Sequence, residues 1–306
     1  MNSATREAFG KALAELGATN PDVVSLDADL SCTTKSGTFA AKFPDRFFNM
    51  GIAEADLMAT AAGLATCGKI PFASTFAVFA TCRALDQIRN SICYPMLNVK
   101  VVGTHAGPSC GEDGGSHQAV EDIAIMRSLP HMVVVVPADD VEAEKVVHAA
   151  AEYIGPMYLR FARLASPTVH ERDYDFDLFR GEIMHEGNDV AIIACGMMVP
   201  RALDAAKQLE AEGIHARVVN MHTIKPIDVE LVEDCARTCG KIVTIEEASM
   251  VGGLGSAVCE VVAEYCPVPV KRIGMPDIFG KSGPGADLLD EFGLSAEHII
   301  EVVKSF

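Results

Sequence analysis

The chain has 306 residues, of which 49% are hydrophobic, and it carries a formal net charge of -17. This length predicts two domains, and the hydrophobic share is enough for a large core. The acidic balance argues against a nucleic-acid-binding protein, because such binding depends on clustered lysines and arginines that neutralise phosphates. It leaves room for a small anionic substrate, which needs only a few local cations.

The N-terminal sequence "MNSATREAFGKALAEL" predicts an amphipathic helix and lacks the apolar stretch of a secretory signal. The longest uncharged apolar runs, such as "MVVVVPA", are too short to span a bilayer. We therefore expect a soluble, cytoplasmic protein whose ten cysteines are free thiols, several of them buried. Cys235 and Cys239 share a helix face, but no second pair of ligands accompanies them, so we predict no metal site there.

The first half of the chain alternates short β-branched runs with longer helical patterns. The runs predict strands at 22–28, 98–106, 132–138 and 157–162. The helical patterns lie at 52–66, 83–93, 118–128 and 139–153. This alternation is typical of βαβ units around a mostly parallel sheet, and the continuously apolar run at 132–136 suits a strand that is covered on both faces.

Residues 166–188 are more polar and predict a linker with a short antiparallel piece, after which the alternation resumes. Strands are predicted at 189–196, 215–223, 241–247 and 269–276, and helices at 198–213, 228–240, 252–265 and 285–304. We therefore predict an α/β fold of two domains, at 1–165 and 188–306, joined by a linker at 166–187.

Two segments of the first half are ambiguous by themselves. Glu54 lies at the start of the helix in "GIAEADLM", where the helix dipole favours an acid whatever its function. Phe72, Phe76 and Phe79 stand among small residues. They are either ordinary core residues or aromatic faces with room for a flat ligand ring beside them.

The segment "THAGPSCGEDGGSHQ" at 104–118 is the strongest functional signal. It follows a predicted strand, so its side chains lie at the carboxyl edge of the sheet, where ligands bind in open α/β folds. His105, Glu112, Asp113 and His117 can point into one cleft, and histidine suits proton transfer near neutral pH. A metal site is the alternative, but the spacing fits no familiar ligand set. A solvated loop is the other.

Cations that can bind a phosphate occur at four places, and their importance depends on whether they converge in space. These cations are Arg6, Lys35, Arg160 and Arg163. The turn "GGLGSAV" at 252–258 precedes a helix but does not have the spacing of a nucleotide-binding loop, and close helix–sheet packing explains its glycines as well.

At these segments the sequence resembles the C-terminal half of transketolase, a thiamine-diphosphate enzyme, in the version split over two polypeptides. The resemblance covers almost the whole chain. It is carried by "GIAEADLM", "STFAVF", "THAGPSCGEDGGSHQAVEDIAIMRSLP" and "VPADD", and further on by "HTIKPID", "EEASMVGGLGS" and "DIFGKSG". The long loop motif is far more specific than the glutamate or the glycines. The resemblance implies a pyrimidine-binding domain followed by a smaller transketolase C-terminal domain.

The resemblance also implies roles toward the cofactor. Glu54 matches the glutamate that hydrogen-bonds N1′ of the aminopyrimidine and so activates thiamine diphosphate. Phe76 and Phe79 match the aromatic residues that hold the pyrimidine ring, and Asp29 matches a carboxylate near the cofactor.

A second group of matches implies roles toward the substrate. His105 and His117 match substrate-site histidines, so with Glu54 they are the expected catalytic residues. Asp113 matches an aspartate that contacts a sugar hydroxyl, whereas Glu112 has no assigned role. The positions that bind the sugar phosphate are matched by Arg6, Thr33 and Arg163, with Lys35 as an assisting cation.

The diphosphate-binding part of the family pattern is missing. The family holds the diphosphate through Mg²⁺, with a Gly-Asp-Gly motif and a downstream Asn as oxygen ligands, and this sequence has no Gly-Asp-Gly. We therefore expect no metal ligand on this chain. The resemblance implies an N-terminal partner subunit that carries the diphosphate and Mg²⁺ site, with thiamine diphosphate shared at the interface of an α2β2-type assembly.

The expected activity is transfer of a two-carbon ketol unit from a ketose phosphate to an aldose phosphate, and it requires the partner. Three alternatives remain open. The first is the beta subunit of a 2-oxo-acid dehydrogenase, which also lacks a diphosphate domain but has little use for sugar-phosphate cations. The second is a deoxyxylulose-phosphate-synthase-like enzyme, which normally carries its diphosphate domain in the same chain. The third is a non-catalytic assembly subunit.

Overall fold

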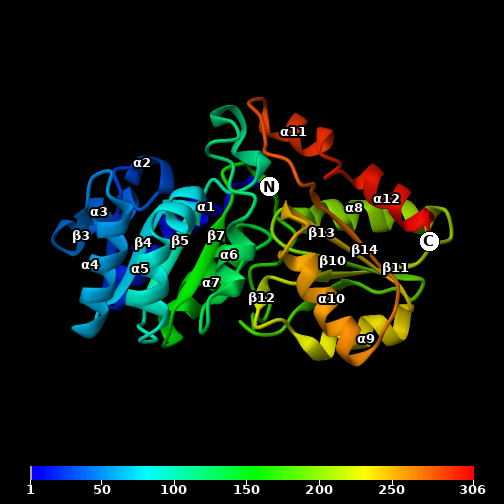
Figure 1. The fold of residues 1–306 in the computed structure, drawn as a ribbon, viewed down its shortest axis with the longest axis horizontal. Helices are drawn as coiled ribbons and strands as arrows, with labels where there is room; N and C mark the ends of the chain where they lie inside the picture. The colour runs from blue at the N-terminus through cyan, green and yellow to red at the C-terminus, as the bar shows by residue number, and fades with distance from the viewer. Residues whose placement is uncertain (1) are drawn as a thin grey trace.

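The computed structural model describes residues 2–306 and has two lobes, each built on a β-sheet covered by helices (Figure 1). The predicted α/β class is therefore confirmed. Apart from one edge strand at 223–225, the chain forms the first lobe from its N-terminal half and the second from its C-terminal half, with α12 at the far end of the second lobe. The domain limits at 165 and 188 stay a prediction.

The first sheet has seven strands in the order β12-β6-β7-β5-β4-β2-β3, and all neighbours are parallel except β12 and β6. The strands are β2 (Val23–Asp27), β3 (Phe47–Asn49), β4 (Ile70–Phe76), β5 (Lys100–Thr104), β6 (Val133–Val135), β7 (Met157–Phe161) and β12 (Thr223–Lys225). The main helices around it are α1 (Thr5–Thr19), α4 (Glu54–Thr66), α6 (Asp122–Ser128) and α7 (Asp140–Glu152). Shorter helical segments are α2 (Ser31–Thr34), α3 (Gly37–Lys42), η1 (Pro44–Arg46), η2 (Phe79–Arg83), α5 (Leu85–Gln87), η3 (Ile88–Cys93) and η4 (Pro108–Asp113).

The second sheet has five strands in the order β14-β13-β10-β11-β9, parallel except for the edge strand β9. Its strands are β9 (Glu182–His185), β10 (Val190–Ala194), β11 (Ala216–Asn220), β13 (Ile242–Ser249) and β14 (Val270–Met275). The helices are α8 (Met198–Ala211), α9 (Val229–Cys239), α10 (Leu254–Tyr265), α11 (Gly285–Glu291) and α12 (Ala296–Lys304). A separate two-stranded ribbon joins β1 (Asn2–Ser3) to β8 (Ser166–Pro167).

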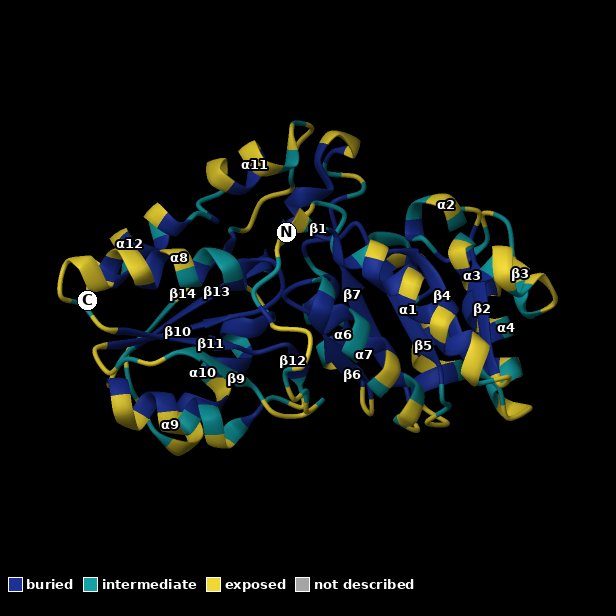
Figure 2. Cartoon of the chain, turned by 180° about the vertical axis from the view of Figure 1, so that it is seen from behind, coloured by how far each residue is buried: buried dark blue, intermediate teal, exposed yellow. Residues whose placement is uncertain are grey.

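The central strands of both sheets are buried on both faces, whereas the helices expose only their outer sides (Figure 2). This arrangement explains the apolar runs in the sequence, since strands sandwiched between helices have no solvent face. Phe72 is a fully buried core residue, which is one of the two alternatives that the sequence left open for it. All ten cysteines are free, but Cys67, which the sequence places in an apolar context, is exposed.

Several elements differ from the sequence prediction. The helix expected at 285–304 is two helices, because Gly293 has a φ of +74° after α11 and Ser295 caps α12 by accepting from the His298 amide. The strand expected at 215–223 ends at Asn220, and β12 crosses to the first sheet beside β6. The helix expected at 83–93 is wound largely as π-helix, and strands β3 and β4 were not predicted.

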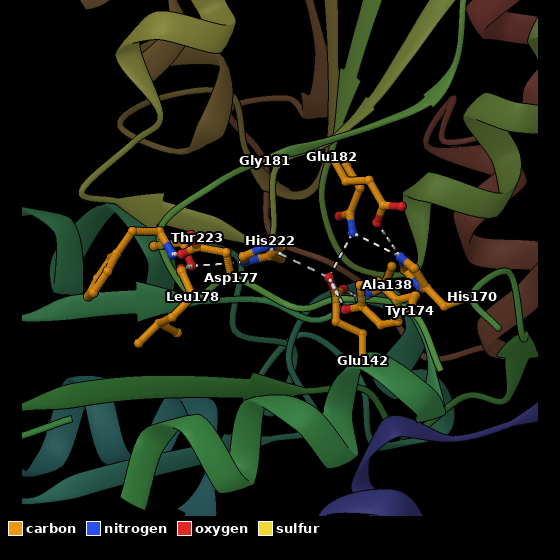
Figure 3. A network of polar contacts seen from close by, with 12 residues as sticks. Ala138, Glu142, His170, Tyr174, Asp177, Leu178, Gly181, Glu182, His222 and Thr223 are labelled. Atoms are coloured by element: carbon orange, nitrogen blue, oxygen red, sulfur yellow. Dashed lines mark hydrogen bonds and ion pairs between the residues drawn. The ribbon is translucent and has the colours of Figure 1, made fainter. Parts of the chain in front are cut away.

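The linker is fixed to both lobes by a buried polar network (Figure 3). His170 lies between two carboxylates, with Nδ1 2.9 Å from Asp139 Oδ2 and Nε2 3.1 Å from Glu182 Oε2. Glu142 accepts hydrogen bonds from the Tyr174 hydroxyl, 3.3 Å, and from the Asn220 amide, 2.8 Å. Asp139 and Glu142 belong to the first lobe and Asn220 to the second, so the network joins all three parts of the chain.

No helix among residues 2–306 has the length and apolar character needed to cross a membrane.

Candidate active site

The site forms at the carboxyl edge of the first sheet, where β2, β4 and β5 end side by side. Parallel strands present all their carboxyl ends at one edge, so the loops that follow them converge. The loop after β2 brings Thr33 and Lys35, the end of β4 brings Phe76, and the loop after β5 brings His105 and the rest of its motif.

These segments enclose a pocket of about 450 Å³. It contains eight of the eleven residues predicted from the sequence, contributed by α1, by the loops after β2 and β5, by the end of β4 and by the segment after β7. Its lining consists of Arg6, Cys32, Thr33, Lys35, Phe76, His105, Asp113, His117 and Arg163. Cations, histidines and a carboxylate that lie up to 157 positions apart in sequence therefore share one cavity.

His105 is held by contacts on three sides. Arg6 Nη1 donates to His105 Nε2 at 2.8 Å, and the imidazole stacks on Phe76 with ring centroids 4.1 Å apart. Because arginine can only donate, Nδ1 carries the proton and donates to Thr104 Oγ1 at 2.8 Å. Burial, together with Arg6 and Arg163 nearby, lowers the pKa of His105 to about 3. His105 is therefore a neutral hydrogen-bonding group at physiological pH.

Buried Asp27 shapes the loop that carries Thr33 and Lys35. Its carboxylate accepts from the Leu30 amide, from the Thr34 hydroxyl and from the Ser36 hydroxyl. Burial raises the pKa of Asp27, and these donors oppose that rise. The folded loop places the Thr33 carbonyl 3.0 Å from Arg6 Nη1, so Arg6 bridges the loop and His105.

The remaining cations of the pocket are already paired with surface acids. Lys35 Nζ lies 3.0 Å from Glu7 Oε1. Arg163 Nη1 donates to Asp113 Oδ2 at 3.0 Å and to the Cys110 carbonyl at 2.7 Å, and its Nη2 is 3.6 Å from Glu112 Oε2. Glu112, which the sequence left without a role, thus contributes to the charge environment of Arg163.

The aromatic part of the site adjoins the pocket. Phe76 and Phe79 stack with centroids 5.6 Å apart and an interplanar angle of 13°, and the His117 ring meets Phe79 edge-on at 5.3 Å. Glu54 begins α4 and its side chain is only 5% exposed. Its carboxylate Oε1 pairs with Arg83 Nη1 at 3.1 Å, and the same guanidinium lies 4.1 Å from the Phe79 ring centroid. Glu54 and Phe79 are therefore linked through Arg83.

Two residues from the sequence analysis lie elsewhere. Asp29 is exposed and does not line the pocket; it hydrogen-bonds Asn49, whose Nδ2 is 3.3 Å from Asp29 Oδ1. Arg160, considered as a phosphate ligand, is buried and donates to Asp122 Oδ2 at 2.7 Å and to the Glu247 carbonyl at 2.8 Å. Arg160 therefore belongs to an interior ion pair and cannot contact a substrate in the pocket.

The second lobe directly supports the loop after β5, which carries His105, Asp113 and His117. The segment before α11 packs on the loop after β5, and the two lie together at the top of Figure 1. Gln118 Nε2 donates to the Lys281 carbonyl at 2.9 Å. A Cβ atom at Gly115 would lie 2.5 Å from the Gly280 carbonyl oxygen, so glycine is required for this close approach. Buried Glu247 accepts from the Ser109 amide at 2.7 Å.

The sequence analysis missed two residues, Cys32 and Arg83. Cys32 lines the pocket because it neighbours Thr33 on α2, and its position in "SCTT" carried no functional signal. Arg83 reaches Glu54 from 29 positions away. Arg83 stands four residues after Phe79, and residues at that spacing are neighbours on a helix surface. The sequence therefore indicates the contact of Arg83 with Phe79 but not its contact with Glu54.

The chain is similar to known protein families and to solved structures. The model of the transketolase pyrimidine-binding domain matches residues 2–168, and that of the transketolase C-terminal domain matches residues 180–299. A solved chain described as a split gene transketolase in an inactive beta4 tetramer is 57% identical, with a TM-score of 0.92 over 99% of this chain and 97% of that one.

Two curated relatives match over nearly their full length. A Methanocaldococcus jannaschii protein, named as a candidate transketolase C-terminal section, is 47% identical over 96% of this chain and 93% of its own. A 6-deoxy-6-sulfo-D-fructose transketolase subunit from Clostridium sp. is 40% identical over 96% of this chain and 92% of its own. With both domain models matched in order, the chain belongs to the transketolase family.

Proposed function

We propose that this chain is the C-terminal subunit of a two-chain transketolase that moves a two-carbon ketol unit from a ketose phosphate to an aldose phosphate. The observation that carries the proposal is the pocket itself. It combines cations able to bind a terminal anion, two histidines and a carboxylate able to bind hydroxyl groups, and an aromatic stack at one side. A phosphorylated sugar presents the groups that these cations and hydrogen-bonding side chains can bind, namely a terminal phosphate and several hydroxyl groups.

The residues beside the pocket fit the pyrimidine half of thiamine diphosphate. Glu54 offers a buried carboxylate, and Phe76 with Phe79 offers aromatic faces for a flat ring. When bound, the cofactor supplies the nucleophilic carbon and the electron sink that ketol transfer needs. Glu54 would hydrogen-bond N1′ of the pyrimidine by donating a proton toward it and taking that proton back, and the two phenylalanines would orient the ring.

The pocket residues act on the substrate. Arg6 and Arg163 bind the terminal anion and use that remote binding energy to position the carbonyl carbon. His105, being neutral, orients a substrate oxygen by hydrogen bonding, whereas half-buried His117 is the better placed histidine for moving a proton. Asp113 accepts from a sugar hydroxyl. Thr33 and Lys35 complete the anion site, and the role of Asp29 as a carboxylate near the cofactor is proposed from the family resemblance alone.

A partner subunit is part of the proposal. No group of three or more His, Cys, Asp or Glu side chains in the described part of the chain can hold a metal ion. We propose that Mg²⁺ and the diphosphate are bound by an N-terminal transketolase subunit in an α2β2 assembly. The related split-gene chain, which is described as an inactive beta4 tetramer, supports a requirement for a second kind of subunit. The ten free cysteines agree with a cytoplasmic location.

The test is reconstitution. The purified chain is mixed with the candidate partner, thiamine diphosphate and Mg²⁺, and is assayed with xylulose 5-phosphate and ribose 5-phosphate. We expect ketol transfer with both chains present and none with either alone. Turnover of pyruvate without turnover of sugar phosphates would identify a 2-oxo-acid dehydrogenase subunit instead, and condensation of pyruvate with glyceraldehyde 3-phosphate a deoxyxylulose-phosphate-synthase-like enzyme. Loss of every activity in the assembled complex would favour an assembly subunit.

The substrate panel extends beyond pentose phosphates. Guanidinium and ammonium groups bind sulfonate as well as phosphate, and the Clostridium relative is named for a sulfonated sugar. The same assay is therefore run with 6-deoxy-6-sulfo-D-fructose. The ratio of kcat/KM between the two donors then decides which anion this pocket selects.

A further inference from the structure

Arg83 makes two contacts that the proposed function does not use. It is the last residue of the π-helical segment η2, and its guanidinium lies over the Phe79 ring at 4.1 Å from the centroid. Its Nη1 donates to Glu54 Oε1 at 3.1 Å. One flat, charged group thus engages both the buried carboxylate and the aromatic ring that flank the pocket.

These are the same two kinds of contact that the proposed site offers an aminopyrimidine: stacking on an aromatic face and a hydrogen bond to Glu54. A guanidinium resembles such a ring in being planar, delocalised and rich in N–H donors. We propose that Arg83 competes with the cofactor's pyrimidine for Glu54 and Phe79, so that Arg83 must swing out when the cofactor binds. This inference rests on the proposed function of the site.

The surroundings of Arg83 permit such a movement. Its side chain is 53% exposed, whereas that of Glu54 is 5% exposed. Within residues 2–306, the Glu54 pair and the Phe79 contact are the only polar or ring interactions described for the guanidinium. A long, half-exposed side chain with one buried partner can rotate into solvent without disturbing the core. Short π-helical stretches of this kind are frequent at functional sites.

The energetic consequence is a reduced apparent affinity. The fraction of molecules with Arg83 turned outward sets the fraction competent to bind the pyrimidine, and the apparent Kd rises in inverse proportion to it. Removing the guanidinium is expected to tighten binding about three- to tenfold, which corresponds to about 0.6–1.4 kcal/mol since tenfold equals about 1.4 kcal/mol.

The test measures cofactor binding by titration calorimetry on the assembled two-chain complex with Mg²⁺. Wild type is compared with Arg83→Met, which keeps the length of the side chain without its charge, and with Arg83→Gln as a second variant. The matched control is Arg89→Met, because Arg89 is exposed in the adjoining segment and its side chain hydrogen-bonds the neighbouring Asn90. We expect a lower Kd for thiamine diphosphate in both Arg83 variants and an unchanged Kd in the control.

An equal or higher Kd in the Arg83 variants would overturn the competition and would make Arg83 a support for Glu54. If the wild-type complex binds no thiamine diphosphate, the proposed function fails, and the role of Arg83 fails with it. Near-identical circular dichroism and melting temperatures across the variants verify that the comparison concerns binding and not folding.

Discussion

Three residues of the predicted site have backbone conformations that amino acids with side chains rarely adopt. Asp29, Lys35 and His105 have φ values of 63°, 71° and 60°. This left-handed region costs energy for any residue with a Cβ atom, and such costs concentrate where the surrounding structure fixes a functional side chain. For His105 the fixing contacts are Arg6, Thr104 and Phe76.

At the same scale, Glu54 is the residue whose replacement tests the proposed chemistry most directly. Glu54→Ala removes the proton-exchanging carboxylate, so we expect kcat of the reconstituted enzyme to fall at least about 100-fold. The fold should survive, since the substitution leaves α4 intact and alanine favours helix. Steady-state kinetics and thermal melting measure the two effects.

The control for this variant is Asp56→Ala in the same helical turn. Asp56 is exposed and accepts a hydrogen bond from the Thr60 hydroxyl, at 3.4 Å. Activity within a factor of two of wild type is expected there. Near-normal activity of Glu54→Ala would remove Glu54 from the mechanism.

At the scale of elements, buried polar groups hold the linker in place. Burial alone would lower the pKa of His170, but its hydrogen bonds to Asp139 and Glu182 outweigh burial and raise the pKa to about 10. Both ring nitrogens donate, so His170 is an imidazolium between two carboxylates. Figure 3 shows its contact with Glu182. The ring also stacks on Tyr174, with centroids 4.4 Å apart.

His170→Asn should therefore destabilise the protein in a pH-dependent way. Because the folded pKa, about 10, lies above the unfolded value of about 6.5, the charge contributes fully below about pH 6.5 and is lost as the pH rises toward 10. We expect a loss of about 3 kcal/mol near pH 6 that shrinks toward pH 10. Urea unfolding of wild type and variant at several pH values measures it.

The comparison variant is His298→Asn, since the His298 side chain is 44% exposed and pairs with Glu301 across one helical turn at 3.3 Å. It should change the free energy of unfolding by no more than about 0.5 kcal/mol. A His170 effect that stays constant between pH 6 and pH 10 would contradict the imidazolium assignment.

In the whole molecule, a buried ion pair of the first lobe is also hydrogen-bonded to the second lobe. Arg160 on β7 donates to Asp122 and also to the Glu247 carbonyl on β13, and Tyr158 donates to Asp122 Oδ2 at 2.7 Å. Burial raises the pKa of Glu247, opposed by Arg160, and the Glu247 carboxylate in turn holds the Ser109 amide. The second lobe therefore supports the loop that carries His105 and Asp113.

Asp122→Ala would leave Arg160 buried without its partner. We expect a loss of about 3–5 kcal/mol in unfolding free energy and a lower melting temperature by calorimetry. Asp173→Ala in the exposed part of the linker is the control and should be close to neutral. A change below about 1 kcal/mol at Asp122 would contradict a stabilising role for this ion pair.

The sequence by itself determined the α/β class, most strands and helices and the transketolase resemblance, because these depend on local periodicity and on a long contiguous motif. It also supplied eight of the nine residues that line the pocket, partly through the family resemblance and partly because the segment at 104–118 follows a strand at the carboxyl edge of the sheet. It could not place β12 in the first sheet or divide the last helix, because strand pairing and helix breaks are decided by packing between distant segments.

Only the tertiary structure decided which charges face the pocket. The sequence offers Arg6, Arg160 and Arg163 as equivalent candidates for binding phosphate. In the structure, Arg160 forms a buried ion pair with Asp122, whereas Arg6 and Arg163 line the cavity. Likewise, the pairing of Arg83 with Glu54 and the neutral state of His105 depend on burial and on neighbours brought together by folding. Charge, hydrogen bonding and desolvation act through distance in space, which a linear sequence does not contain.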